Sequence, residues 1–218
     1  MVVGLIGMSG VGKSSWAARL AGAGLTPFYC DDLIAERLRV ETGAGTVSVH
    51  DVGRWMGFPY ERRYAERERI YLAYEGAILA EIADHVAADD DVVIDMTGSV
   101  VYLEPDLLAR IGRLATIIYL AADPDLHQCL LADYLAMPRP VVWNGMFQPF
   151  PGEDPAAALV RCYPLLLQTR AALYEQFGDV VIDSRLHRHP AFGVADLLSL
   201  AAQATSRARH QATDHPIV

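Results

Sequence analysis

The sequence predicts an α/β fold in which helices cover both faces of a parallel sheet of five strands. Short apolar segments with the length of buried strands alternate along the chain with segments of helical composition. This alternation is typical of parallel sheets, because each connection crosses one face of the sheet and carries a helix with it. A glycine-rich stretch directly after the first strand supports this interpretation. The expected strands are Val2–Ile6, Pro27–Cys30, Val92–Met96, Ala115–Leu120 and Val180–Asp183.

The helices are indicated by apolar spacing and by signals at their starts. In the segment 61–85, Tyr64, Tyr71, Ile78 and Ile82 recur on one helical face. Asp-Pro pairs at 123–124 and 154–155 are typical helix starts, with aspartate as the N-cap and proline at the first helical position. The expected helices are Lys13–Ala21, Leu33–Arg39, Glu61–His85, Glu104–Arg110, Pro124 to about Leu135, Pro164–Phe177 and Phe192–Ala204. Segments 42–60 and 136–153 show no periodicity and are expected to be irregular.

Length and composition indicate one domain, residues 1–204, followed by a frayed polar tail at 205–218. The net charge of -9 disfavours partners such as nucleic acid or an anionic membrane, which need a basic surface. No apolar run approaches the roughly 20 residues that span a bilayer. Three cysteines without metal-like spacing, and no basic segment before the first strand, indicate a cytoplasmic protein. We expect a monomer or a weak homodimer.

The stretch GMSGVGKS fits the phosphate-loop pattern G-x-x-x-x-G-K-[ST], and it lies where that pattern requires, between a strand and a helix. Its backbone N–H groups are expected to surround phosphate oxygens, assisted by the helix N-terminus. The pattern predicts that Lys13 reaches the β- and γ-phosphates and that the Ser14 hydroxyl ligates Mg²⁺. The expected ATP-binding residues are Gly7, Met8, Ser9, Gly10, Val11, Gly12, Lys13, Ser14 and Ser15.

Lys13 is also notable because the chain contains one lysine and seventeen arginines. A phosphate in a tight backbone cradle favours a compact ammonium on a flexible stem over the larger planar guanidinium. The use of lysine at this one position therefore indicates a phosphate ligand. The alternative interpretation is a glycine-rich turn that binds nothing.

Carboxylates follow two of the expected strands. Asp31 and Asp32 come after the second strand, where one of them is placed to ligate Mg²⁺ or to accept a proton from a hydroxyl. Asp95 ends the third strand, a usual position for the residue that orients Mg²⁺. The alternatives are a helix N-cap for the adjacent pair and a solvated strand end for Asp95. Which member of the pair would be the base stays open.

Two further groups of residues are candidates for the acceptor of a phosphoryl group. Thr97, Gly98 and Ser99 form a small turn with two hydroxyls, which suits a polar substrate but also fits a plain turn. Arg170 lies on a later helix and faces either the acceptor or the solvent.

The segment 136–153 is rich in proline and glycine and is predicted to be a lid. Long loops without secondary structure are usually functional or disordered. An arginine on a closing lid can neutralise charge during phosphoryl transfer, and Arg139 is placed for that task unless it is merely an exposed loop residue. Trp143, Phe147 and Phe150 either close over a substrate or anchor the loop.

With these residues assembled, the chain resembles the shikimate kinase family of P-loop small-molecule kinases over residues 1–200. GMSGVGKS matches the nucleotide loop, and FYCDDLI matches the stretch after the second strand. DMTGSVV lies where that family has its substrate turn. Met137-Pro138-Arg139-Pro140 resembles the Arg-Pro start of the family's lid, TRAALY resembles the helix segment that binds the substrate carboxylate, and Arg188-His189-Pro190 resembles the adenine-side Arg-x-Pro.

The resemblance implies a three-layer P-loop kinase fold with strand order 2-3-1-4-5 and a mobile lid. It implies ATP-dependent transfer of a phosphoryl group to a hydroxyl of a small anionic acceptor, with ATP and Mg²⁺ as cofactors. The implied catalytic residues are Lys13, Asp31, Asp32 and Arg139, and the implied metal ligands are Ser14, Asp31 and Asp95. Arg188 and Pro190 would lie beside the adenine. The implied acceptor-binding residues are Asp32, Arg63, Arg67, Thr97, Gly98, Ser99 and Arg170.

The departures from the family pattern lie on the acceptor side. The two aspartates are adjacent rather than spaced by one residue, and Thr97 and Ser99 replace two of three glycines. The family's Arg-x-x-Glu has only approximate counterparts in Arg63 and Arg67, and the lid is longer. Two alternatives stay open: a nucleoside or nucleotide kinase that uses the aromatic lid insert to bind a base, and a non-catalytic nucleotide sensor.

Overall fold

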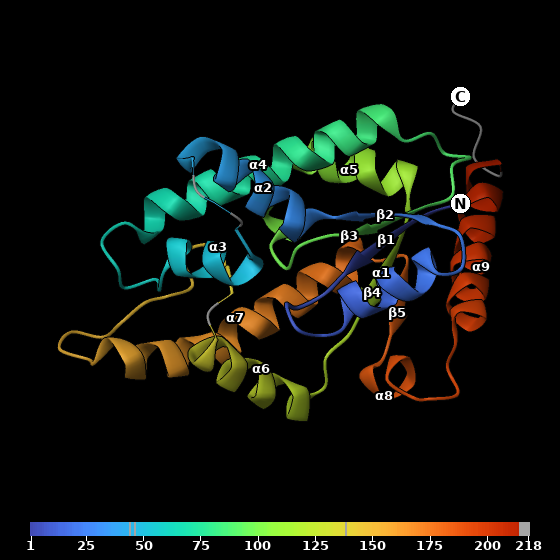
Figure 1. The fold of residues 1–218 in the computed structure, drawn as a ribbon. Helices are drawn as coiled ribbons and strands as arrows, with labels where there is room; N and C mark the ends of the chain where they lie inside the picture. The colour runs from blue at the N-terminus through green and yellow to red at the C-terminus, as the bar shows by residue number, and fades with distance from the viewer. Residues whose placement is uncertain (44, 46, 138, 214–218) are drawn as a thin grey trace.

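The computed structural model describes residues 1–43, 45, 47–137 and 139–213, and these form three layers with a sheet in the middle (Figure 1). The strands pair in the order β2-β3-β1-β4-β5, and each pair of neighbours is parallel. The predicted fold class and strand order are therefore confirmed. The strands are β1 (Val2–Ile6), β2 (Thr26–Tyr29), β3 (Val92–Asp95), β4 (Thr116–Leu120) and β5 (Val180–Ile182).

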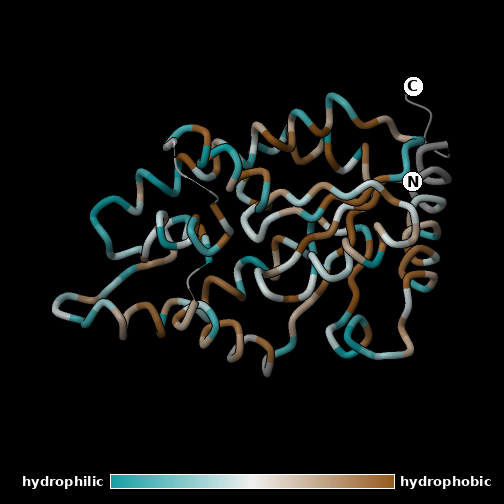
Figure 2. Tube along the Cα trace, viewed as in Figure 1, coloured by the Kyte–Doolittle hydropathy of each residue, from teal (hydrophilic) through white to brown (hydrophobic). Residues whose placement is uncertain are grey.

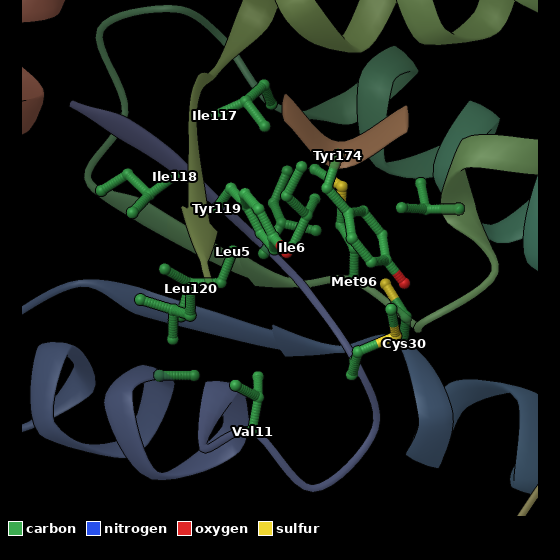
Figure 3. Packing of buried hydrophobic residues seen from close by; sticks show 14 of the residues in the cluster. Leu5, Ile6, Val11, Cys30, Met96, Ile117, Ile118, Tyr119, Leu120 and Tyr174 are labelled. Carbon is green, nitrogen blue, oxygen red and sulfur yellow. The ribbon is translucent and has the colours of Figure 1, made fainter. Parts of the chain in front are cut away.

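Strand β1 lies in the middle of the sheet and is buried along its whole length, as expected for a strand covered on both faces. Its residue Val3 aligns with Val93 of β3 and with Thr116 of β4. Leu5 and Ile6 belong to the hydrophobic core between the layers (Figure 3). Because the strands are parallel, the loops that follow β1, β2 and β3 lie at the same edge of the sheet.

Helix α1 contacts β1, β2 and β3, α9 contacts β4 and β5, and these two helices contact each other (Figure 1). Helices α5 and α7 contact β4, and α4 packs against α5. A short 3₁₀ turn, Val100–Tyr102, follows β3. The helices are α1 (Lys13–Ala21), α2 (Cys30–Thr42), α3 (Val49–Met56), α4 (Tyr64–His85), α5 (Pro105–Leu114), α6 (Pro124–Ala136), α7 (Pro155–Phe177), α8 (Ser184–His187) and α9 (Val194–Thr213).

The expectation that residues 42–60 are irregular is wrong, because this segment contains α3. The Ser48 side chain accepts a hydrogen bond from the Asp51 backbone, and the Asp51 side chain accepts one from the Ser48 backbone. This reciprocal pair is a capping box, here with aspartate in place of the usual glutamate or glutamine. The sequence therefore carried a helix start that the composition of the segment concealed.

The C-terminal half also differs from expectation at three points. The helix start predicted at Asp154-Pro155 is confirmed, but α7 runs unbroken from Pro155 to Phe177 with Pro164 inside it, whereas we expected a separate helix to begin at Pro164. The short helix α8 was not expected; the Asp183 side chain caps it by accepting from the backbone N–H of Arg185. Helix α9 continues to Thr213, beyond the expected end at 204. The last residues of the expected tail, 214–218, lie outside the described residues.

Figure 2 shows the hydrophobic residues concentrated along the central strands and the hydrophilic ones on the outlying loops and helix surfaces. Cys30 and Cys162 are buried and Cys129 is exposed, each as a free thiol. None of the helices in the described part of the chain is long and apolar enough to cross a membrane.

Candidate active site

The phosphate loop connects β1 to α1 through backbone conformations that favour glycine. Gly10 and Gly12 have φ angles of 86° and 115°, in the left-handed range. At Gly7 a Cβ atom would lie 2.6 Å from the carbonyl oxygen of Leu120, so only glycine allows the loop to approach β4 this closely. Gly12 is the N-cap of α1 and no side chain caps this helix. The first N–H groups of α1 are thus placed to bind an anion.

Lys13 is directed back across its own loop. Its Nζ donates to the carbonyl oxygens of Gly7, at 3.0 Å, and of Met8, at 3.1 Å. The side chain is only 6% exposed, and this burial lowers the pKa of Lys13, while the charges of Asp95 and Asp31 oppose that change. The ammonium is therefore held at the loop by carbonyl oxygens, with two carboxylates close enough to stabilise its charge.

Asp95 ends β3 beside the phosphate loop and is buried. Burial raises the pKa of Asp95, against the opposing effects of the Lys13 charge and a hydrogen bond from the Ser14 hydroxyl. Its Oδ1 is buried without a hydrogen-bond partner among the described residues. An unsatisfied buried oxygen of this kind needs a reason, and it excludes the alternative of a solvated strand end.

These observations fit a Mg²⁺ ion, which binds oxygen ligands and usually takes one or two protein groups together with substrate phosphates and water. Ser14 and Asp95 are the residues that would hold it. In the described residues no group of three His, Cys, Asp or Glu side chains forms a metal-binding cluster. A site that depends on one carboxylate, one hydroxyl and the nucleotide is consistent with that result.

Asp31 and Asp32 lie in the first turn of α2, and neither is its N-cap, because Tyr29 occupies that position. The N-cap alternative for this pair is therefore wrong. The Oδ1 of Asp31 accepts from the hydroxyl of Tyr71 at 2.9 Å. Burial raises the pKa of Asp31, while the Lys13 charge and the Tyr71 hydrogen bond oppose that change. Asp31 is half-buried, whereas Asp32 is exposed.

The turn formed by Thr97, Gly98 and Ser99 follows β3. The side chains of Thr97 and Ser99, on either side of Gly98, are buried. The Thr97 and Ser99 hydroxyls both donate to the carboxylate of Glu75, Ser99 at 2.6 Å. These hydroxyls are thus hydrogen-bonded within the protein, and a contact of Thr97 or Ser99 with a substrate stays a prediction. The carbonyl oxygen of Gly98 accepts from the Tyr174 hydroxyl, so the backbone of Gly98 is what the turn presents.

Glu75 is a residue that our sequence analysis missed. It is completely buried, at 0% exposure, and burial raises its pKa to about 7 while the Ser99 and Thr97 hydroxyls oppose that change. A signal was present in the sequence. Glu75 lies four residues after Tyr71 and three before Ile78, on the apolar face of α4. A carboxylate on such a face needs hydrogen-bond partners.

Arg170 on α7 is buried, so it faces the protein interior rather than the solvent. Its Nη2 donates to the carbonyl oxygen of Val142, and its Nε lies 3.4 Å from the Tyr102 hydroxyl. No carboxylate lies within ion-pair distance of it in the part of the chain that the structure describes. The Arg170 charge lowers the pKa of both Glu75 and Lys13. A buried guanidinium without a carboxylate partner is suited to an anionic ligand.

The predicted lid is anchored along part of its length. The Tyr64 hydroxyl donates to the carbonyl oxygen of Val141 at 2.7 Å, and the backbone N–H of Trp143 donates to Glu68. Trp143 is 1% exposed and contacts the rings of Tyr134, Phe147 and Tyr163. Trp143 therefore anchors the segment, as one of our two interpretations stated. Phe150, by contrast, is 61% exposed.

Arg139 begins the anchored part of the lid and lies close to the phosphate loop. Its charge acts on both Lys13 and Asp31, lowering the pKa of each. It is half-buried, so it is not merely an exposed loop residue. Pro138, which precedes it, lies outside the described residues. The mobility of the lid stays a prediction.

Four of the expected site residues lie apart from this group. Arg63 is the exposed N-cap of α4 and lies 3.7 Å from a carboxylate oxygen of Glu66. Arg67 is half-buried, with its guanidinium 5.9 Å from the ring centre of Trp55. Arg188 and Pro190 are exposed after α8. In the described residues, no hydrogen bond or ion pair connects these four to the phosphate loop.

Comparisons with known proteins agree with the fold. No family model matches the chain, and no curated protein matches it. Among solved structures it is similar to shikimate kinase from Aquifex aeolicus (TM-score 0.57, 14% identity, covering 94% of this chain and 98% of that one). It is also similar to shikimate kinase from Acinetobacter baumannii in complex with shikimate (0.55, 18%, 95% and 93%). A third is shikimate kinase from Bacteroides thetaiotaomicron (0.54, 16%, 96% and 98%).

At these identities the likeness establishes the fold and nothing finer. The chain has the P-loop kinase fold: a five-stranded parallel sheet in the order 2-3-1-4-5, with a phosphate loop after its central strand.

Proposed function

We propose that this protein transfers the γ-phosphoryl group of ATP to a hydroxyl of a small anionic acceptor. The observation that carries the proposal is the group formed by Lys13, Asp95 and Asp31 at the carboxyl edge of the sheet. Lys13 and Asp95 are buried and Asp31 is half-buried, and burial shifts the pKa of all three beside a phosphate loop. Groups with perturbed pKa values that converge beside a ligand-binding loop are candidates for catalysis.

The nucleotide side is assigned to the phosphate loop. The N–H groups at the start of α1 would bind the phosphates, and Lys13 would leave its carbonyl partners to contact the β- and γ-phosphates. Mg²⁺, held by Ser14 and Asp95, would supply charge neutralisation when bound. These assignments need only the loop and two strand ends, which lie at one edge of the sheet.

The acceptor side is assigned to Asp31, Arg139 and Arg170. In the transfer step the oxygen of the acceptor hydroxyl would bond to the γ-phosphorus while the bond between that phosphorus and ADP breaks. Asp31 would accept the proton that the hydroxyl loses. Its pKa, raised by burial, favours such a role, since a base works best when its pKa is nearer the working pH. Arg170 would pair with the anionic group of the acceptor. The acceptor's identity is proposed only as far as this class, for which shikimate is the first compound to test.

The experiment follows a label from ATP to the acceptor. We expect [γ-³²P]ATP and Mg²⁺ to give a labelled product with a hydroxylated acid such as shikimate or D-gluconate, in equal amount with ADP. Adenosine, cytidine and thymidine form the second arm, because labelling of a nucleoside would favour the alternative of a nucleoside kinase. Binding of ATP without label transfer to any compound would contradict the proposal and favour a nucleotide sensor.

A further inference from the structure

We infer that Glu75 is a positioning residue for the acceptor, a role that rests on the proposed function. Its carboxylate holds the turn from Thr97 to Ser99 so that Gly98 lies between the phosphate loop and Arg170. The role differs from direct contact, because Glu75 is completely enclosed and would act on the acceptor only through the turn that it holds.

The hydrogen bonds around Glu75 form a closed network. One carboxylate oxygen accepts from the Ser99 hydroxyl at 2.6 Å, and the other accepts from the Thr97 hydroxyl. Within the turn, the Thr97 and Ser99 hydroxyl oxygens are 2.9 Å apart, and the Ser99 N–H donates to Thr97 Oγ1 at 3.1 Å. Both flanking side chains are thus fixed on Glu75, and both lie out of solvent.

Gly98, between Thr97 and Ser99, lies where the phosphate loop and Arg170 approach each other. A Cβ atom added to Gly98 would lie 3.4 Å from the backbone nitrogen of Ser9 in the phosphate loop. It would lie equally close, at 3.4 Å, to Nη1 of Arg170. The Tyr174 hydroxyl fixes the Gly98 carbonyl from α7. Movement of this turn would therefore alter the spacing between the phosphate loop and the buried guanidinium.

A purely structural role does not account for a carboxylate at this position. Burial of a carboxylate costs free energy, and a well-packed apolar side chain often stabilises a core equally well or better. The other charged or titratable side chains that act on or respond to Glu75 are Cys30 and Asp31 on α2, Tyr71 on its own helix, and Arg170 and Tyr174 on α7. Glu75 thus contacts a turn that lies between the phosphate loop and Arg170.

The test compares three substitutions of threonine residues. Thr97→Val removes the donor to Glu75 while keeping the shape, and Thr97→Ser keeps the donor. With the hydroxy acid that gives the highest turnover, shikimate or D-gluconate, we expect Thr97→Val to raise the acceptor KM about tenfold, as for loss of a hydrogen bond to a charged group. The KM for ATP should stay unchanged. Thr97→Ser should restore a near-normal KM. Thr116→Val is the matched control, because Thr116 begins β4 and so lies at the opposite edge of the sheet from Thr97, which follows β3.

A double-mutant cycle then ties the effect to Glu75. Glu75→Gln should also raise the acceptor KM, and the Glu75→Gln/Thr97→Val pair should be no worse than the more severe single variant, because both remove one interaction. Glu81→Gln is the control, since Glu81 lies on the same helix in an exposed ion pair with Arg37.

The outcomes are distinguishable. Unfolding that occurs at lower denaturant in Thr97→Val and Glu75→Gln, with an unchanged acceptor KM, would show that Glu75 only stabilises the fold and would overturn the inference. An equal rise in the KM for ATP would overturn it as well. Failure of the unsubstituted protein to phosphorylate any compound in the panel would instead overturn the proposed function on which the inference rests.

Discussion

The proposed nucleotide side and the proposed acceptor side of the site are built in different ways. The nucleotide side is one continuous stretch, Gly7 to Ser14, whose groups are mostly backbone and whose cation bonds to carbonyl oxygens five and six residues away. The acceptor side takes Asp31, Glu75 and Arg170 from three different helices. It is held by side-chain contacts between residues far apart in sequence, such as Tyr174 with Gly98.

This difference shows why one half agrees with a common motif and the other does not. A phosphate cradle depends on the conformation of a few glycines, so it changes little from one protein to another with the same motif. The acceptor side depends on which side chains meet across the fold. Here the hydroxyls of Thr97 and Ser99 donate to Glu75.

The largest effect should separate the two adjacent aspartates. Asp31→Asn should lower kcat on the order of 10²–10⁴-fold, the usual contribution of a general base. We expect the large effect at Asp31 because this carboxylate lies close enough to Lys13 to raise its pKa. Asp32→Asn should change kcat little, since Asp32 is exposed and its charge is not among those that shift the pKa of Lys13. Steady-state kinetics at saturating ATP would measure both. The reverse ranking would move the base to Asp32.

Trp143→Ala tests whether the lid is anchored. Removal of a fully buried tryptophan should lower the free energy of unfolding by about 3–5 kcal/mol. Phe150→Ala, in the exposed part of the same segment, should change it by less than about 1 kcal/mol. Denaturant unfolding would measure both variants. Equal, small effects would mean that the whole segment 139–153 is free of the core.

Lys13→Arg tests the nucleotide side. Although the charge is kept, the guanidinium does not fit the space in which the ammonium bonds to Gly7 and Met8. We expect kcat to fall on the order of 10²–10³-fold, as for loss of one preorganised donor at a charge-stabilising site, with weaker ATP binding. Arg37→Lys, in an exposed ion pair, is the matched control. Near-normal activity of Lys13→Arg would refute the phosphate-loop assignment.

The acceptor side should also give the protein a pH-dependent stability. Burial raises the pKa of Glu75 from its ordinary value of 4.5 to about 7, so the folded protein keeps a proton that the unfolded chain has lost. The free energy of unfolding should then fall by up to ~1.4 kcal/mol per pH unit between these two values and level off above them. Denaturant unfolding of the unsubstituted protein and of Glu75→Gln across this pH range would isolate the contribution of Glu75 to the free energy of unfolding. Parallel curves would show that Glu75 is ionised throughout.

The smallest effect concerns Arg139. If it contacts the transferring group chiefly in the transition state, Arg139→Ala should lower kcat about tenfold with little change in the KM for ATP. Arg161→Ala is the control, because Arg161 pairs with Glu153 at the exposed end of the same segment. A rise in the ATP KM at unchanged kcat would instead place Arg139 in ground-state nucleotide binding.

The sequence by itself determined the features that depend on neighbouring residues. The alternation of strands and helices follows from apolar runs, and the phosphate loop follows from its glycines and Lys13. The missed helix α3 was also locally encoded by the Ser48 and Asp51 capping pair. The strand order came from resemblance to a known family, because local pattern does not specify which strands become neighbours.

Only the tertiary structure decided the acceptor side. Whether Asp31 or Asp32 turns toward Lys13 depends on how α2 packs. Glu75 acquires its partners 22 and 24 residues further along the chain, and the lid is anchored by a contact between Tyr64 and Val141, 77 residues apart. Arg63 and Arg67 only approximate the family's Arg-x-x-Glu, and in the structure neither is connected to the phosphate loop by a hydrogen bond or ion pair among the described residues. Contacts over such separations arise from the packing of whole elements, whose effect on one side chain leaves no local pattern in the sequence.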